Sequence, residues 1–321
     1  MVDILSLQPN VISRDLRGKY ILLAGQPKVG KTEFICSSED ALVCAFEIGT
    51  NAQSGAYVIP IDKWSTFKQV VRQLETPEAH AKYKTLGLDT IGIAFDLCEK
   101  FICQQNGVQK LSDIPYGAGY AMRDKEFEET LRKITMMSYG LIMTCHLKET
   151  YDEDGKLLSL RPDLNNRCYK IVNGLCDVIC SITQTWDENG ESHRWIRTRP
   201  SPTVFAGSRY KYLDPVIPFG FNEFEQALAK AIDEAEKHGA KVVDSIEAPK
   251  EVQLSFTELR NEASELWTKL MSSTDDQEYM YNTLMKKIEI IFGKKIKLSE
   301  VTEDQVDLME LVVIEMRSMV A

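Results

Sequence analysis

The segment Gly25-Gln-Pro-Lys-Val-Gly-Lys-Thr32 constrains this chain more than any other feature of its sequence. It fits the pattern G-x-x-x-x-G-K-[ST], which forms a phosphate-binding loop (P-loop) when a buried strand precedes it and a helix follows. The apolar run at 20–24 supplies the strand, and a helix can begin at Lys31. A chance glycine turn before a helix is the alternative, and the flanking pattern argues against it.

The residue types in this loop suit a nucleotide triphosphate. Glycines let the backbone curl so that successive N–H groups face phosphate oxygens, and the helix N-terminus adds partial positive charge. Lys31 is expected to reach the β- and γ-phosphates, and the Thr32 hydroxyl to bind Mg²⁺. We therefore predict ATP and Mg²⁺ as ligands. The expected nucleotide-binding residues are Gly25, Gln26, Pro27, Lys28, Val29, Gly30, Lys31, Thr32 and Glu33.

Three polar residues follow other apolar runs and complete a candidate catalytic set. Asp89 directly follows the run 85–88. We expect it to be the second residue that holds Mg²⁺, either directly or through a water molecule. Thr90 follows it, where many ATPases place a catalytic glutamate, so we assign the base to Glu47, after the run 41–46. His146 ends the run 140–145 and is the candidate γ-phosphate sensor. Each could instead be an ordinary structural group at a strand end.

The order of apolar runs and helical patterns predicts an α/β fold with a mostly parallel central sheet flanked by helices. Most expected strands are continuously apolar, as in strands covered on both faces. They cover 20–24, 41–46, 57–61, 85–88, 140–145, 178–182 and 194–197, with helices at 64–75, 90–105 and 121–138. Hairpin turns are expected at 152–155 and 187–190.

The remaining chain predicts a small C-terminal helical domain. We expect an N-terminal segment at 1–18, an ATPase core at 19–239 ending in the helix 222–239, a linker at 240–254 and the helical domain at 255–321. Its helices are expected at 255–271, 275–292 and 302–319, the last opened by a capping box from Thr302 to Gln305. A helical arm packed on the core is the alternative.

Charge and composition limit the classes of protein. The net charge of the 321-residue chain is −10, which argues against a protein coated in nucleic acid. The acidity is local, because residues 246–321 carry 15 acids and 9 bases whereas residues 1–221 carry 27 and 26. The first two-thirds can therefore present a basic face. Eight irregularly spaced cysteines and the absence of a secretory pattern or an apolar run of about 18 residues predict a cytoplasmic protein without a membrane span.

The ordered set of motifs over 19–221 resembles the RecA-like ATPase core of recombinases. It looks most like the phage nucleotide-binding proteins of the Sak-four type, the RecA-like single-strand annealing group. Local stretches similar to that group include Phe46-Glu-Ile-Gly49, Leu88-Asp-Thr90 and Thr144-Cys-His-Leu147. Two further ones are Gly174-Leu-Cys-Asp-Val-Ile179 and Arg197-Thr-Arg-Pro-Ser201. Residues 1–18 lack a convincing oligomerisation strand, so a long filament is not expected.

The resemblance implies further site residues. Arg197 and Arg199 match the two basic residues that reach the nucleotide of a neighbouring subunit, although cross-strand pairing on a sheet is the alternative. Two loops of such proteins face DNA, and they correspond here to 106–119 and 148–170. The implied DNA-binding residues are Lys110, Tyr116, Lys148, Arg161, Asn165, Asn166, Arg167 and Lys170. A solvated hairpin is the alternative for the second loop.

The leading hypothesis is a DNA-dependent ATPase that binds single-stranded DNA and promotes annealing or recombination in a phage. It implies a homo-oligomer, as a ring or short filament, a single-stranded DNA-binding protein as partner, and the host cytoplasm as location. A nucleotide-gated loader or scaffold for replication or recombination partners is the second hypothesis. A P-loop kinase is the third, although the chain shows no lid segment with clustered arginines.

Overall fold

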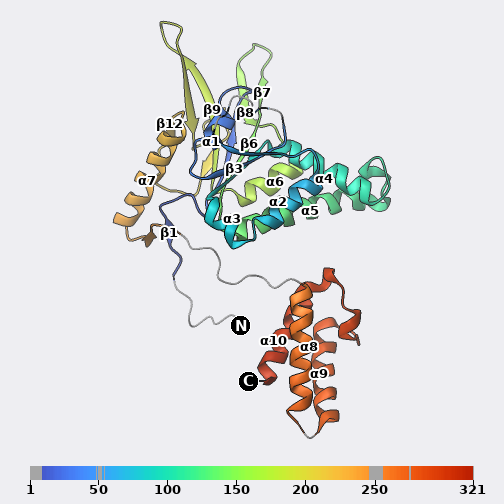
Figure 1. The fold of residues 1–321 in the computed structure, drawn as a ribbon. Coiled ribbons are helices and arrows are strands. Elements are labelled where there is room, and N and C mark those ends of the chain that lie inside the picture. Colours follow the sequence, from blue (N-terminus) through green and yellow to red (C-terminus); the bar gives the residue numbers. More distant parts are fainter. Residues whose placement is uncertain are drawn as a thin grey trace. The chain divides into compact units, whose positions relative to one another are not determined.

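The computed structural model of the chain describes residues 9–47, 49, 53, 55–245, 256–274 and 276–320 (Figure 1). These residues fall into two compact units, one within 9–245 and one within 256–320. Residues 240–245, expected to begin a linker, belong to the first unit. The rest of the expected linker, 246–254, lies outside the described residues.

A mixed sheet forms the centre of the first unit and confirms the predicted fold class. Its order is β4-β3-β5-β6-β2-β9-β10-β12, with the short β11 paired to β9. All neighbours from β4 to β9 are parallel, and β9, β10, β11 and β12 pair antiparallel. The bounds are β2 Tyr20–Ala24, β3 Ala41–Ala45, β4 Tyr57–Pro60, β5 Thr85–Asp89, β6 Gly140–Cys145, β9 Val178–Trp186, β10 Ser192–Arg197, β11 Gly207–Ser208 and β12 Val216–Pro218.

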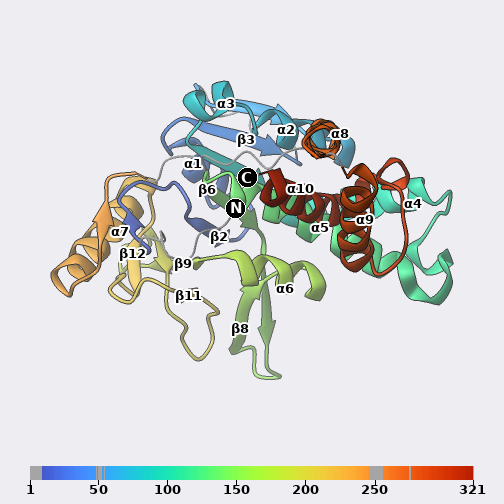
Figure 2. The same cartoon turned by 90° about the horizontal axis from the view of Figure 1, so that it is seen from below.

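Helices cover both faces of this sheet, which explains why its central strands are continuously apolar. Alternate residues of β2 face opposite sides, so Leu22 packs in one core cluster and Leu23 in another. Figures 1 and 2 both show α7 on one side of the sheet and α4 and α5 on the other. The helices are α1 Lys31–Cys36, α2 Trp64–Gln73, α3 Pro77–Lys82, α4 Ile91–Gln105, α5 Ala118–Met136, α6 Asn166–Leu175 and α7 Phe221–Lys237.

The register of the parallel strands brings the candidate catalytic residues to one edge. Ala24 pairs with Cys145, and Ala45 pairs with Asp89. The segments that follow β2, β3, β5 and β6 therefore leave the sheet side by side. Since β6 lies between β2 and β5, the P-loop and Asp89 are separated by one strand, and His146 follows that strand.

Two hairpins extend beyond this edge of the sheet in Figure 1. One joins β7 Leu147–Tyr151 to β8 Leu157–Pro162, and the other joins β9 to β10. Both predicted turns are confirmed. Asp152 accepts hydrogen bonds from the N–H groups of residues 154 and 156 in the first turn. Asp187 accepts from those of residues 189 and 191 in the second.

The segment before β2 pairs with the end of the same unit. Its strand β1, Ile12–Ser13, runs parallel to β13, Val242–Val243. The buried side chain of Lys19 hydrogen-bonds to this segment. Its side chain is 2% exposed, and the ammonium donates to the carbonyl and hydroxyl of Ser13, at 2.6 and 2.7 Å, and to the carbonyl of Asp15. Burial lowers the pKa of Lys19 to about 8, partly opposed by the charges of Asp15 and Asp177.

We expect the unfolding free energy of the parent, minus that of a Lys19→Met variant, to increase from pH 8 to pH 10. The unfolded chain keeps the Lys19 proton up to the ordinary pKa of 10.5, whereas the folded protein releases it near 8. The folded state therefore binds fewer protons in this window, and the parent gains stability as pH rises. The full shift is worth about 3 kcal/mol. Denaturant unfolding of both proteins at pH 7.5, 8.5 and 9.5 measures this difference. A difference that stays constant or decreases with pH contradicts the expectation.

The second unit is a small helical domain, described by itself. It contains α8 Phe256–Ser272, α9 Gln277–Phe292 and α10 Val306–Val320, with 3₁₀ turns at Leu298–Glu300 and Glu303–Gln305. The predicted capping box at Thr302 and Gln305 is present. Leu266, Leu284 and Met309 come from the three helices and share one apolar core. Met316 of α10 also lies in this core. In the part of the chain that the structure describes, no helix is long and apolar enough to cross a membrane.

Candidate functional site

The P-loop connects β2 to α1 and needs its glycines for two different reasons. A Cβ atom on Gly25 would lie 2.7 Å from Val29 Cγ1 and 2.8 Å from Ile182 Cδ1, so any larger residue there would force these side chains to shift. Gly30 adopts φ 105° and precedes the first residue of α1, a backbone conformation that glycine tolerates without strain. Lys28 is also left-handed, at φ 64°. The loop thus curls around its own backbone, as expected for a phosphate cradle.

Lys31 is buried beneath this curl. Its side chain is 6% exposed, and its ammonium donates to the carbonyls of Gly25 and Gln26, each at 2.9 Å. Burial lowers the pKa of Lys31, while the charges of Asp89 and Glu47 oppose that shift. The lysine is therefore a cation held in a poorly solvated place next to the loop, where an added phosphate would stabilise its charge.

Asp89 and Thr32 meet as a metal-binding pair would require. Asp89 is 2% exposed, and Thr32 Oγ1 donates to its Oδ2 at 2.5 Å, while Thr144 Oγ1 donates to Oδ1. Both groups offer hard oxygen donors, which Mg²⁺ prefers. Neighbouring oxygens around an octahedral Mg²⁺ lie about 2.9 Å apart at its usual bond lengths. A widening of a few tenths of an ångström would accommodate the ion, so the donor set fits Mg²⁺.

His146 lies between Lys31 and Glu47. Its Nδ1 is 3.4 Å from Lys31 Nζ, and its Nε2 is 3.8 Å from Glu47 Oε2. An ammonium can only donate, so Nδ1 accepts and the ring proton of a neutral histidine sits on Nε2, facing Glu47. The structure thus brings together the loop lysine, the candidate sensor and the candidate base. Gln26 adds a further contact, donating from Nε2 to Glu149 Oε1 at 2.6 Å, which links the loop to β7.

The two arginines expected to act on a neighbouring subunit differ in the structure. Arg197 is the last residue of β10, and its Nε is buried without a hydrogen-bond partner in the described part of the chain. Arg199 lies beyond the strand and donates to the carbonyls of residues 208, 210 and 211 at 2.5 to 3.0 Å. The expected intersubunit role does not fit Arg199, because its guanidinium is committed to a loop of its own chain.

Arg194 is a P-loop neighbour that sequence reasoning missed. It lies on β10, and its Nη1 donates to the carbonyl of Val29 at 2.8 Å. Its guanidinium lies over the ring of Phe219, 4.6 Å from the centroid. No local motif marks this residue, since its position depends on β10 pairing beside β9, which in turn pairs with the P-loop strand.

The expected first DNA loop, 106–119, is compact rather than open. It forms 3₁₀ turns at Leu111–Asp113 and Pro115–Gly117, and Leu111 and Ile114 are buried in a small apolar cluster. Tyr116 is fully exposed at its tip, with φ 59°. Lys110 is exposed, and its backbone N–H donates to Asp113. Both candidate side chains are accessible to solvent.

The segment 148–170, expected as the second DNA loop, contains the hairpin whose turn is predicted at 152–155 and a helix that follows it. It folds as the β7–β8 hairpin followed by α6, because the Asp152 turn closes the hairpin and Asn165 caps the helix by accepting from the N–H of Arg167. Lys148 pairs with Arg161 across the hairpin. The loop is therefore an ordered surface.

Five of the six candidates of this second segment line three different cavities. Lys148, Arg161 and Asn166 line a cavity of about 630 Å³, here named the hairpin groove, between the β7–β8 hairpin and residues 200–205. Tyr169 and Phe205 also line it, with ring centroids 5.7 Å apart. Asn165 lines a separate cavity of about 210 Å³ that includes His146. Lys170 is exposed and lines neither of these two cavities.

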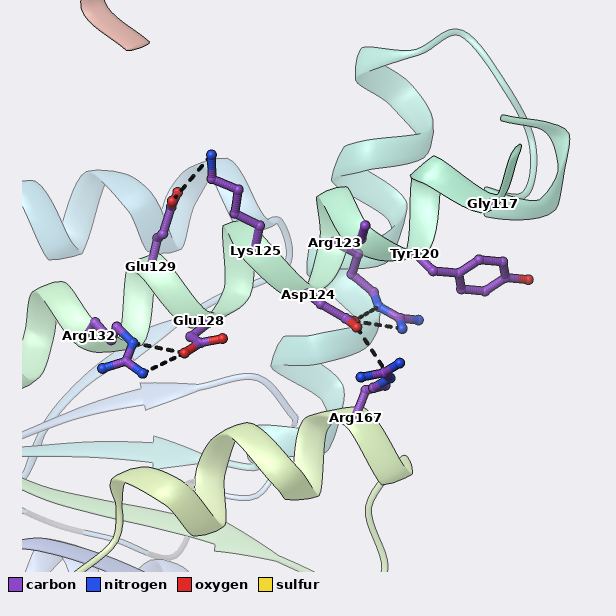
Figure 3. Close-up of a pocket in the computed structure, with 10 residues that line it drawn as sticks. Gly117, Tyr120, Arg123, Asp124, Lys125, Glu128, Glu129, Arg132 and Arg167 are labelled. Atoms are coloured by element: carbon purple, nitrogen blue, oxygen red, sulfur yellow. Dashed lines mark hydrogen bonds and ion pairs between the residues drawn. The ribbon is translucent and has the colours of Figure 1, made fainter. Parts of the chain in front are cut away.

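Arg167 belongs to a third surface, a cavity of about 810 Å³ along α5. Figure 3 shows Arg167 and Arg123 pointing at Asp124 from two helices. Arg167 Nε lies 3.7 Å from Asp124 Oδ2, and Arg123 also bonds Glu99. Each of the four cations that line this surface lies within 4 Å of a carboxylate, so the surface is not a strong candidate for binding a phosphate backbone.

A protein-family model, a prophage-derived protein and a solved structure are similar to parts or all of this chain. Residues 17–210 match the sequence model of a protein family described as an AAA domain. The SPbeta prophage-derived uncharacterized protein YorG of Bacillus subtilis (strain 168) is 26% identical over 332 residues, covering 100% of this chain and 99% of that protein. A crystal structure of the flagellar accessory protein FlaH from Methanocaldococcus jannaschii gives a TM-score of 0.34 at 10% identity, covering 64% of this chain and 85% of that one.

Proposed function

The chain belongs to the AAA domain family, whose members are nucleotide-hydrolysing P-loop ATPases, and from that premise we propose that it binds single-stranded DNA and promotes annealing or recombination in an ATP-dependent manner. The prophage-derived relative supports a phage context, and with it the host cytoplasm as location. The hairpin groove and its connection to the nucleotide edge carry the proposal.

Hydrolysis in this proposal uses the residues that meet at the sheet edge. Thr32 and Asp89 would hold Mg²⁺, which supplies positive charge to the phosphates. Lys31 binds the β- and γ-phosphates. Glu47 takes a proton from a water whose oxygen bonds to the γ-phosphorus as the bond to the β–γ bridging oxygen breaks. Arg197 of a neighbouring copy would neutralise charge on the leaving phosphates, so the proposal includes a homo-oligomer, as a ring or short filament.

The groove supports the choice of single-stranded DNA. Lys148 and Arg161 place two cations side by side, suited to a phosphate backbone. Tyr169 and Phe205 add aromatic faces in the same groove, and Phe205 is 40% exposed. Cations interleaved with aromatic rings bind single strands with little base preference. Asp163 lines the groove as well, so affinity depends on the two cations outweighing one acid.

Two contacts connect the nucleotide edge to the groove. His146 contacts Lys31 and is followed directly by β7. Gln26 of the P-loop bonds Glu149, the neighbour of Lys148 on that strand. A triphosphate in the loop adds negative charge beside Glu149 and His146, which favours a new arrangement of β7. ATP and DNA affinity are then coupled reciprocally.

The test reverses charge in the groove. We expect Lys148→Glu with Arg161→Glu to weaken binding of a fluorescent single-stranded oligonucleotide by about 100-fold at 50 mM salt, and to lower the salt slope by about 1.4, because two phosphate contacts are lost. DNA-free ATP turnover should stay unchanged, while its stimulation by DNA disappears. Lys125→Glu with Lys230→Glu is the matched control, because both lysines are exposed on other helices, α5 and α7.

A Lys31→Ala protein sets the background of each turnover assay. Equal DNA affinity in both double variants would contradict the groove. Turnover that ignores DNA at either of two salt concentrations would favour the alternative of a nucleotide-gated loader or scaffold. A single-stranded DNA-binding protein is the partner that this proposal implies, and it can be added to the same annealing assays.

A further inference from the structure

Two residues outside the P-loop, Arg194 and Phe219, pack against the peptide bond between Val29 and Gly30. Arg194 Nη1 donates to the carbonyl of Val29 at 2.8 Å. A Cβ atom on Gly30 would lie 2.9 Å from Arg194 Nη1 and 3.0 Å from Phe219 Cε1. The arginine and the ring therefore pack directly against the loop at the point where α1 begins.

The geometry of the peptide bond relates this contact to phosphate binding. In a planar trans peptide, the C=O and N–H groups point in opposite directions. The Val29 carbonyl faces Arg194, so the N–H of Gly30 faces away from it. A P-loop binds phosphate through such N–H groups, and glycine at the next position makes a peptide flip easy. A flipped peptide would present a carbonyl oxygen, which repels phosphate.

The sheet holds Arg194 in place for this task. The backbone N–H of Phe219 donates to the Arg194 carbonyl at 2.9 Å, which fixes the ring beside the arginine. The ring centroid lies 4.6 Å from the guanidinium carbon, and a cation over an aromatic face is attracted to it. Phe219 also lies 6.1 Å from Phe34 of α1, centroid to centroid. Arginine, ring and helix thus form one packed unit behind the loop.

We propose that Arg194 is a positioning residue for nucleotide binding, which locks the Val29–Gly30 peptide with its N–H available to phosphate. It acts through the loop backbone of its own chain and takes no part in the chemical step. This inference rests on the P-loop ATPase family alone, so it stands or falls separately from the DNA groove.

The experiment compares the parent with three variants by calorimetric titration with ADP and by ATP turnover. Arg194→Met keeps the packing on Phe219 but removes the donor, and Arg194→Lys keeps a single donor. We expect Arg194→Met to raise the Kd for ADP and the KM for ATP about tenfold, with kcat within about threefold, since a charged hydrogen bond is lost from the binding step only. Arg194→Lys should fall between the two. Arg132→Met, an exposed arginine on α5, is the control.

The proposal is overturned if Arg194→Met binds ADP within twofold of the parent, or if kcat falls while the Kd for ADP stays unchanged. A melting temperature of the nucleotide-free protein within a few degrees of the parent separates a local effect from unfolding. If Arg194→Met fails to fold, Arg194→Lys and Phe219→Leu take its place under the same criteria, with raised Kd supporting the proposal and unchanged Kd overturning it.

Discussion

Replacing Glu47 with glutamine is expected to lower ATP turnover by about 100-fold or more, because a positioned general base contributes a factor of this order. The change is isosteric, so the side chain can keep its contact with His146 Nε2, 3.8 Å away in the parent. Glutamine cannot accept the proton of the attacking water. Binding of ATP should change by less than about threefold, since the interaction is made in the transition state only.

Glu149 is the control that sharpens this prediction. It is the other carboxylate tied to the loop, through its 2.6 Å bond with Gln26. Glu149→Gln should leave DNA-free turnover nearly unchanged, because its assigned effect is on the coupling to β7. Steady-state turnover and calorimetric ATP binding of both variants decide the matter. If Glu149→Gln loses more turnover than Glu47→Gln, the base has been assigned to the wrong strand.

The sequence is enough to predict which residues meet at the carboxyl edge of the sheet, because two simple rules govern where they lie. Continuous apolar runs identify strands covered on both faces, and the carboxyl ends of parallel strands meet at one edge. Those rules are enough to bring Lys31, Glu47, Asp89 and His146 together. The apolar runs also predict the central strands, and local turn signals predict both hairpin turns, since each of these features depends on residues close together in the chain.

Contacts between distant segments escaped the same reasoning. Arg194 reaches Val29 across 165 residues, and Glu149 reaches Gln26 across 123. Both contacts depend on which strand pairs beside which, and no local pattern encodes that order. Arg199 shows another limit. Its intersubunit role came from the resemblance alone, whereas the structure shows its guanidinium donating to the carbonyls of residues 208, 210 and 211 of its own chain.

The affinity for ADP is expected to fall as pH rises into the alkaline range, through the titration of Lys31. Burial lowers the pKa of this lysine below the ordinary 10.5 in the nucleotide-free protein. Phosphate oxygens beside the ammonium raise that pKa again in the complex. Between the two values binding takes up a proton, so the Kd rises by up to about tenfold per pH unit. The phosphates of ADP are already ionised there and add no slope.

The Lys31→Met variant shows whether the pH dependence of ADP affinity comes from Lys31 or from another titrating group. It should bind ADP about 100-fold more weakly at pH 7.5, because a buried charge–phosphate interaction is lost, and its residual affinity should be independent of pH. Lys125→Met, an exposed lysine, should keep the parental profile. Titrations from pH 7 to 10 in buffers of different ionisation heat also count the proton taken up. A flat parental profile, or an equal slope in Lys31→Met, would mean that Lys31 does not titrate with binding.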